Sequence, residues 1–320
     1  MRRYYLDFEK RLEPLENRLD EIQRFYDTRD PHHAKEVVSL RKRISKLEKE
    51  IYSELTPWQR SQASRHLDRP HALDYIQKLF TDFTELHGDR RFKDDPAMVC
   101  GFAAFEGVNV AIVGQQKGKD VREMARRNFG MAHPEGYRKA MRIMELADRW
   151  GKPILALIDT PGAFPGVGAE ERGQAEAIAA SICYMFSLSA PILILIIGEG
   201  MSGGALAIGV GDRVLMLENA SYSVISPEGC AAILWHDGSK RSLAAEALKP
   251  TSYDLLKLKV IDGIIKEPFG GAHRNWEQTF AATKEALTKH LKEIMEIPID
   301  DLKQQRYEKF RKMGVFEERV

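Results

Sequence analysis

The chain has 320 residues, and 43% of them are hydrophobic. Its 48 Lys and Arg residues nearly balance its 47 Asp and Glu residues, so the net charge gives no general attraction to nucleic acid or to an anionic membrane. Its three cysteines are too few and too far apart for a disulfide framework, which favours a reducing compartment. The N-terminal segment lacks the apolar core of a signal peptide and the longest apolar run is too short to cross a bilayer, so we expect a cytoplasmic protein that binds neither membrane nor nucleic acid.

The first part of the chain is predicted to be helical. Apolar residues recur in alternating steps of three and four over residues 12–26 and again over 37–51. Between these segments, Asp27 to Pro31 have the composition of a turn followed by a helix start. We therefore expect residues 1–71 to form an antiparallel helical hairpin and a connector with one short helical turn. Because two helices cannot bury both of their faces, the hairpin packs either on this chain or on a partner subunit.

The remaining residues, 72–320, are predicted to form one α/β domain. Short apolar runs typical of buried strands alternate with longer segments of helical periodicity, and this alternation favours parallel strands inside the sheet. Helices are expected over 75–83, 135–150, 169–187, 205–208 and 275–307 and from residue 226 onward, and strands over 98–105, 108–113, 154–159, 191–197, 214–217 and 222–225.

Two glycine-rich turns follow two consecutive predicted strands, the first over residues 160–168 and the second over residues 198–204. Because the carboxyl ends of parallel strands meet at one edge of a sheet, the two turns are expected to border one crevice. The second turn holds Gly198, Gly200, Gly203 and Gly204 and precedes a short helix expected from residue 205, where free backbone N–H groups and the helix dipole favour an anion or a developing oxyanion. The alternative is that these glycines only allow the helix to pack closely against the sheet.

Ser202 gives the second turn the pattern G-x-S-x-G of a nucleophile elbow. A serine hydrolase would also need an acid and a histidine later in the chain. Asp262 and His273 are present, but neither lies in a segment typical of a sharp loop after a buried strand. Asp159 to Gly162 imitate the D-x-x-G switch of GTP-binding proteins, although no P-loop precedes them. What remains favours a site that stabilises an oxyanion with backbone donors.

A basic cluster that includes Lys117, Arg126 and Arg127 has two interpretations, a phosphate-binding patch and a solvated helix face. Zinc sites commonly use paired C-x-x-C motifs, and none occurs here. We therefore expect no metal in this chain.

Six motifs occur in order along the chain: GQQKG at 114–118, RNFGM at 127–131, HPEGY at 133–137, IDTPGA at 158–163 with GAEERG at 168–173, IGEG at 197–200 with SGGA at 202–205, and YSVISPE at 222–228. Together they resemble the carboxyltransferase alpha subunit of bacterial-type acetyl-CoA carboxylase, and the resemblance runs the length of the chain, hairpin included.

The resemblance implies a crotonase-like (ClpP/crotonase) fold of repeated ββα units and an assembly of two alpha and two beta subunits, with the active site between them. In this family the carboxyl group arrives on biotin, which is held covalently by a separate biotin carboxyl carrier protein. It leaves on acetyl-CoA as malonyl-CoA for fatty acid synthesis, and a separate biotin carboxylase consumes ATP. The ureido anion of biotin takes the proton from the acetyl methyl group, so the family needs no side-chain base.

The resemblance also implies roles for particular residues. The N–H groups of Gly203 and Gly204 would hold the ureido oxygen of biotin, and Gly162, Ala163 and Phe164 would shape the facing wall. Lys117, Arg126 and Arg127 are the candidates for contact with CoA phosphates or the carboxylate.

Three further features of the sequence bear on the resemblance. A glycine is expected in the family where Met201 stands, so the Met201 side chain would narrow the biotin channel. The chain lacks the carrier's biotin-accepting lysine between methionines and the beta subunit's four-cysteine zinc site. We therefore expect it to be neither the carrier nor the beta subunit.

Overall fold

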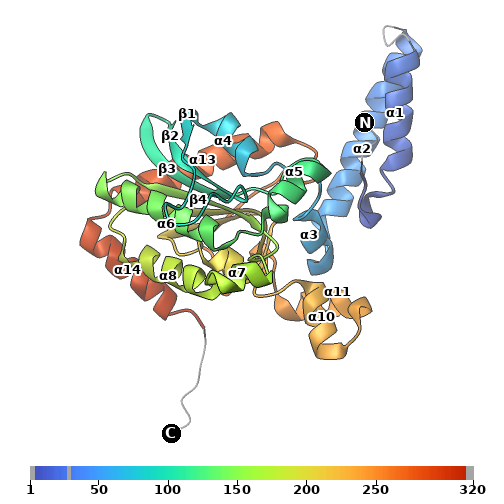
Figure 1. The fold of residues 1–320 in the computed structure, drawn as a ribbon. Coiled ribbons are helices and arrows are strands. Elements are labelled where there is room, and N and C mark those ends of the chain that lie inside the picture. The colour runs from blue at the N-terminus through green and yellow to red at the C-terminus, as the bar shows by residue number, and fades with distance from the viewer. Residues whose placement is uncertain (1–3, 27–29, 315–320) are drawn as a thin grey trace.

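The computed structural model describes residues 4–26 and 30–314, and a mixed sheet of eight strands lies at its centre (Figure 1). The strands are β1 Thr81–Glu85, β2 Met98–Phe105, β3 Val108–Gln115, β4 Ile154–Thr160, β5 Ile192–Met201, β6 Arg213–Leu217, β7 Ser221–Ser223 and β8 Gly263–Ile265. Their order is β1-β2-β3-β4-β5-β6-β8, and β7 pairs with the end of β5. The pairs β1–β2 and β2–β3 are antiparallel and all the others are parallel, as predicted for the inner strands.

Helices cover both faces of this sheet, and β4 and β5 are therefore buried along their whole lengths. On one face, α4 (Ala72–Leu79) contacts β1 to β4 and α13 (Trp276–Met295) contacts β5 and β8. On the other face, α6 (Pro134–Arg149) contacts β2, β3 and α8 (Gln174–Ser187), and α14 (Ile299–Arg311) lies beside α8 (Figure 1). The predicted α/β class is therefore confirmed.

The shorter helices lie mainly around the carboxyl ends of the strands. They are α3 Pro57–Ala63, α5 Val121–Arg126, α7 Val167–Glu171, α9 Ser202–Leu206, α10 Pro227–Trp235, α11 Arg241–Leu248 and α12 Ser252–Lys257, with 3₁₀ turns η1 Asp7–Glu9, η2 Asn128–Gly130 and η3 Gly238–Lys240. Among the helices of residues 4–26 and 30–314, none combines the length and the apolar character needed to span a bilayer.

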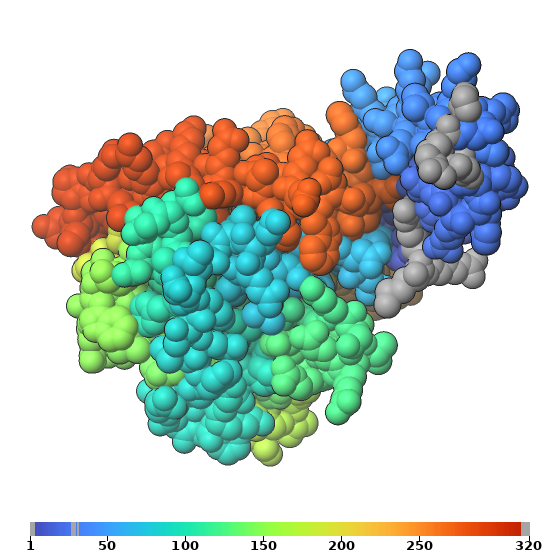
Figure 2. All heavy atoms as spheres, turned by 90° about the horizontal axis from the view of Figure 1, so that it is seen from above, coloured from blue at the N-terminus to red at the C-terminus, as the bar shows by residue number. Residues whose placement is uncertain are grey.

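The N-terminal helices α1 (Glu13–Phe25) and α2 (Pro31–Ser53) form the predicted hairpin, which projects from the α/β body (Figures 1 and 2). Ion pairs from Arg11 to Glu50 and from Arg18 to Glu36 show that the helices are antiparallel. Residues 27–29 of the predicted turn lie outside the described residues.

The base of the hairpin packs on this chain, which was one of the two alternatives. Arg274, in the loop before α13, pairs with Glu16 of α1 and with Glu48 of α2. His273 in the same loop bonds Glu9, which precedes α1, at 3.0 Å. The division of the chain at residue 71 stays a prediction; α4 begins at Ala72.

Several predicted elements were wrong in their extent. The helix expected over 205–208 is α9, and the strand expected over 222–225 is β7 and ends at Ser223. The helix expected over 75–83 ends at Leu79, and Phe83 belongs to strand β1, where its ring packs against the backbone of Gly101 in β2. The helix expected over 169–187 is two helices, α7 and α8, because Gly173 between them has φ 82°. The helix expected over 275–307 is likewise two, α13 and α14, since Pro298 precedes α14 and proline interrupts a helix ladder.

Candidate active site

The second glycine-rich segment is partly strand, which corrects the prediction of a turn over 198–204. Strand β5 continues through Gly198 and Gly200 to Met201, and its register against β4 shifts between Ile158 and Thr160. A side chain at Gly198 would place its Cβ 2.3 Å from Oδ1 of Asp159. Gly198 therefore serves the close approach of two neighbouring strands, a role that neither interpretation of these glycines from the sequence included.

The turn itself is confined to Met201 and Ser202. Met201 is extended, and Ser202 takes φ 55°, a left-handed conformation that is costly for a residue with a side chain. Ser202, Gly203 and Gly204 are the first three residues of α9, so their N–H groups have no acceptor within the helix, and the side chain of Met201 caps none of them. Gly203 is half-buried and Gly204 is buried.

The first glycine turn packs directly on α9. A Cβ at Gly204 would lie 2.3 Å from the carbonyl carbon of Gly162 and 2.5 Å from the nitrogen of Ala163, so the two backbones touch. The hydroxyl of Thr160 fixes this turn, since it donates to the carbonyl of Gly162 at 2.7 Å and accepts from the N–H of the same residue at 3.1 Å. The structure thus brings Gly162, Ala163, Gly203 and Gly204 together, as expected for one crevice.

Phe164 lies at the edge of this arrangement. Its ring stacks on the imidazole of His133 with a centroid distance of 4.2 Å, and its N–H donates to the carbonyl of Ala132 at 3.0 Å. Gln174 at the start of α8 donates to the carbonyl oxygen of Phe164 at 3.0 Å. Burial lowers the pKa of His133 below its usual value, which favours the neutral ring against which Phe164 packs.

Lys117 lies behind the glycine turns in a buried network of charges. Its Nζ is 2.9 Å from Oδ1 of Asp159 and 2.7 Å from Oε1 of Glu199, and Nδ1 of His71 is 2.9 Å from Oδ2 of Asp159. Burial alone would raise the pKa of Asp159, but the charge of Lys117 and the contact with His71 outweigh it and lower this pKa to about 2. Burial would lower the pKa of Lys117, and Asp159 and Glu199 outweigh that effect and raise it. Opposite charges therefore face each other beneath the ends of β4 and β5.

The three cations proposed to contact CoA do not form one cluster. Lys117 is engaged in the buried network, and its side chain is only 12% exposed. Arg127 is buried and donates to the carbonyl of Pro96 at 2.6 Å and to Glu123 at 2.9 Å. Arg126 is exposed on α5, and within the described part of the chain it forms no ion pair. A contact with CoA remains a prediction for all three.

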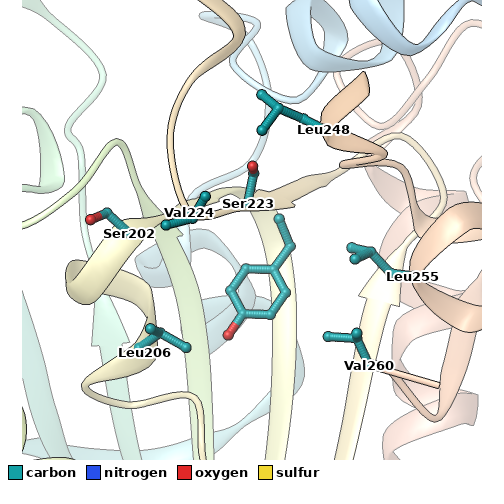
Figure 3. Close-up of a pocket in the computed structure, with 8 residues that line it drawn as sticks. Ser202, Leu206, Ser223, Val224, Leu248, Leu255 and Val260 are labelled. Atoms are coloured by element: carbon teal, nitrogen blue, oxygen red, sulfur yellow. The ribbon is translucent and has the colours of Figure 1, made fainter. Parts of the chain in front are cut away.

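An apolar pocket of about 280 Å³ opens beside α9 (Figure 3). Ser202 and Leu206 border it on one side, and Leu255 and Val260 border it on the other. The remaining lining residues are Tyr222, Ser223, Val224 and Leu248. Met201 is 1% exposed and is not part of this lining, so its side chain does not narrow this pocket.

A serine hydrolase would need a catalytic triad around Ser202, and the described residues form none there. The carboxylate of Asp262 accepts from the N–H of Val214 at 2.7 Å and pairs with Lys309 at 2.5 Å. His273 lies at the base of the hairpin. Within residues 4–26 and 30–314, no hydrogen bond joins Ser202 to a histidine.

One group of three side chains in the described residues has metal-binding chemistry, namely Glu9, His66 and His273. The two imidazole rings are stacked, with centroids 3.8 Å apart and planes inclined by 19°, so their nitrogen atoms lie side by side and do not converge on one point. Nδ1 of His66 accepts from the N–H of Asp68 at 3.1 Å. The arrangement is a hydrogen-bonded contact beneath the hairpin and does not have the geometry of a metal centre.

Several residues that support the site were not recognised from the sequence. Asp159 and Glu199 pair with Lys117, and His71 pairs with Asp159. Gln115 was noted only within a motif. Each of these residues lies near the end of a strand or the start of a helix in the structure. Polar side chains that interrupt an apolar run at a strand end were the available signal.

Comparison with known proteins gives consistent results over nearly the whole chain. The family model described as acetyl co-enzyme A carboxylase carboxyltransferase-like matches residues 5–314. A relative from Syntrophotalea carbinolica, named acetyl-coenzyme A carboxylase carboxyl transferase subunit alpha, is 52% identical over 316 residues, which cover 98% of this chain and 99% of the relative. A relative of the same name from Thermus thermophilus is 54% identical over 313 residues, with 98% and 99% covered.

Solved structures share the fold at much lower identity. A transcarboxylase 12S structure is 21% identical with a TM-score of 0.54, and the match covers 71% of this chain and 44% of that chain. A chain of a Pseudomonas malonate decarboxylase hetero-tetramer in complex with coenzyme A is 19% identical with a TM-score of 0.55, and 68% and 86% are covered. These likenesses concern the fold alone, and they agree with the α/β class predicted from the sequence.

Proposed function

The chain belongs to the acetyl-CoA carboxylase carboxyltransferase alpha-subunit family, and we propose that, together with a beta subunit, it transfers a carboxyl group from carboxybiotin to acetyl-CoA to form malonyl-CoA. The observation that carries this proposal for the site is the pair of backbone turns at the ends of β4 and β5. One turn opens α9 with N–H groups that have no acceptor in the helix, and the other lies against it.

The N–H groups of Gly203 and Gly204 are proposed to donate to the ureido oxygen of biotin. Biotin supplies the carboxyl group and, as an anion after releasing it, the base for the acetyl methyl proton. Donors that are fixed before the reaction stabilise the developing charge most strongly, and removing one such donor typically costs about 100- to 1000-fold in rate. Gly203 is the more open of the two, so its N–H is proposed as the principal donor.

The surroundings of these donors fit a ring system with one polar edge. The pocket beside α9 is lined mainly by apolar side chains, including Leu206, Val224 and Leu255. Apolar walls exclude water, and electrostatic interactions are stronger where water is excluded. Gly162, Ala163 and Phe164 are proposed to form the facing wall, which the contact between Gly204 and Gly162 supports.

A beta subunit is proposed to close the open side of the site in an assembly of two alpha and two beta subunits. Val224, which lines the pocket, is 70% exposed, and Val167 on α7, which follows the first glycine turn, is 75% exposed. On α10, which follows Val224 in the chain, Ile233 and Leu234 are 65% and 62% exposed. Exposed apolar surface of this kind marks interaction sites. A biotin carboxyl carrier protein would then deliver carboxybiotin, which a biotin carboxylase regenerates.

Reconstitution tests the proposed function. The purified chain is mixed with a beta subunit, carboxylated biotin carrier and acetyl-CoA, and malonyl-CoA is measured over time. We expect activity from the mixture and none from either subunit alone, because the site lies open on this chain. Full activity of the isolated chain, or no activity of the mixture, would contradict the proposal.

A further inference from the structure

The two glycine turns meet through backbone atoms alone, so their own side chains cannot fix the distance between them. Gly204 packs on the Gly162–Ala163 peptide without room for a methyl group. Helix α9 has only five residues. A short helix with an open amino end has few internal hydrogen bonds and needs support from outside.

Gln115 at the end of β3 provides that support. Its Nε2 donates to the carbonyl oxygen of Gly204 at 2.6 Å, and its Oε1 accepts from the N–H of Asp159 at 3.2 Å. The side chain is completely buried. One amide group therefore joins the helix that carries the proposed oxyanion donors to the strand that leads into the facing turn.

Both partners of Gln115 are groups that secondary structure leaves unpaired. The β3–β4 ladder ends at the pair Gly114 and Leu157, before Asp159. In α9, the N–H of Ala207 bonds Gly203 and that of Ile208 bonds Ala205, so no helical N–H reaches the carbonyl of Gly204. A buried backbone group without a partner is costly, and glutamine supplies both a donor and an acceptor.

The anchoring point of Gln115 is itself held in place. The Asp159 carboxylate accepts from the N–H of Glu199 at 3.2 Å and pairs with Lys117 and His71. Gln115 therefore ties α9 to a strand end that three contacts of the Asp159 carboxylate hold in place.

We propose that Gln115 is a positioning residue for carboxyl transfer, which holds the amide groups at the start of α9 at the reactive distance from the facing turn. This inference rests on the proposed function. Gln115 touches no reacting atom and acts through the backbone of Gly204. Because a displacement of about 1 Å in an aligned site costs roughly 100-fold in rate, its loss should lower kcat while substrate affinity is retained.

Gln116 offers a matched control. It is the next residue and is also buried, but its Oε1 accepts from the N–H of Leu73 at the start of α4, away from the glycine turns. Each position is changed to methionine in the full chain, which is then assembled with the beta subunit. Thermal midpoints of both complexes, kcat for malonyl-CoA formation and KM for acetyl-CoA are measured.

We expect Gln115→Met to lower kcat by about 10- to 100-fold with KM for acetyl-CoA within about threefold, and Gln116→Met to keep kcat within about threefold. Similar losses of thermal midpoint in the two variants would strengthen the comparison. Equal kcat in both variants, whether retained or lost, would overturn the inference. A wild-type mixture without activity would overturn the proposed function and the inference with it, whereas an active wild type with an equally active Gln115→Met variant overturns the inference alone.

Gln115→Glu adds a readout that a purely structural role would not move. The new side chain keeps the shape of glutamine, but its carboxylate form cannot donate to the carbonyl of Gly204. Burial and the neighbouring carboxylates of Asp159 and Glu199 raise the pKa of such a group, while Lys117 opposes this effect. Because the protonated form can donate, we expect the ratio of variant to wild-type kcat to rise as the pH falls. A ratio that is independent of pH would contradict the donor role.

Discussion

Gly204→Ala is predicted to disable the site without removing any hydrogen-bonding group. The new Cβ would lie 2.3 Å from the carbonyl carbon of Gly162, a backbone atom that no side-chain rotation can move away. Ordinary contact begins at 3.4 Å, so the two turns must separate by about 1 Å. A misplacement of this size costs about 100-fold in rate, or about 2.7 kcal/mol of transition-state stabilisation.

Gly238→Ala is the control for this prediction. Gly238 lies in η3, outside the two turns, and the same methyl group would meet no atom within 4 Å there. We expect malonyl-CoA formation by the assembled complex to fall at least about 100-fold in Gly204→Ala and to stay within about threefold in Gly238→Ala. Equal activity of the two variants would refute the reasoning, as would a larger loss in Gly238→Ala.

Further predictions concern the buried charges, the strained serine and the exposed arginine. Lys117→Met leaves the carboxylates of Asp159 and Glu199 buried without their cation, so denaturant titration should show a loss of about 3–5 kcal/mol in the free energy of unfolding. An unchanged free energy of unfolding would contradict a stabilising role of Lys117 between these two carboxylates. The pKa of Asp159 is lowered to about 2, so the ionised carboxylate stabilises the fold above about pH 4, and this contribution is lost as the pH falls toward 2. Asp159→Asn should remove this part of the pH dependence of the free energy of unfolding. An unchanged pH dependence would argue against this contribution of Asp159. Ser202→Ala should retain carboxyl transfer, and a fluorophosphonate probe should leave the wild type unlabelled, whereas labelling of Ser202 would support a serine hydrolase. Arg126→Gln should raise KM for acetyl-CoA by about 10-fold with little change in kcat, and an unchanged KM would remove Arg126 from the CoA site.

The architecture was predictable because its signals are local. The apolar run of β5 and that of β4 indicate buried parallel strands, and the residues that follow them place two turns at one edge of the sheet. The six motifs supplied the family, and their order along the chain made the resemblance specific. The glycine turn before a helix indicated an anion or oxyanion site, and the resemblance then assigned the donor role to Gly203 and Gly204, which stays a prediction.

Features that depend on distant residues were not predictable in the same way. Gly198 was interpreted as a turn residue, but it lies in β5, and the position requires glycine because Asp159 of the neighbouring strand leaves no room for a side chain. Lys117 was grouped with other cations of a basic segment, and its partner Glu199 is 82 residues away in the chain. Gln115 carries no motif of its own, since its importance comes from two backbone groups that only the folded chain brings within reach.

A structure of the complex of this chain, a beta subunit and biotin tests the central claim most directly, through the distances from the ureido oxygen to the backbone nitrogens of Gly203 and Gly204. We predict hydrogen-bond distances of about 2.7–3.2 Å, with the ring of biotin against the apolar pocket beside α9. Biotin bound elsewhere, with these two N–H groups donating to acceptors of their own chain, would contradict the account.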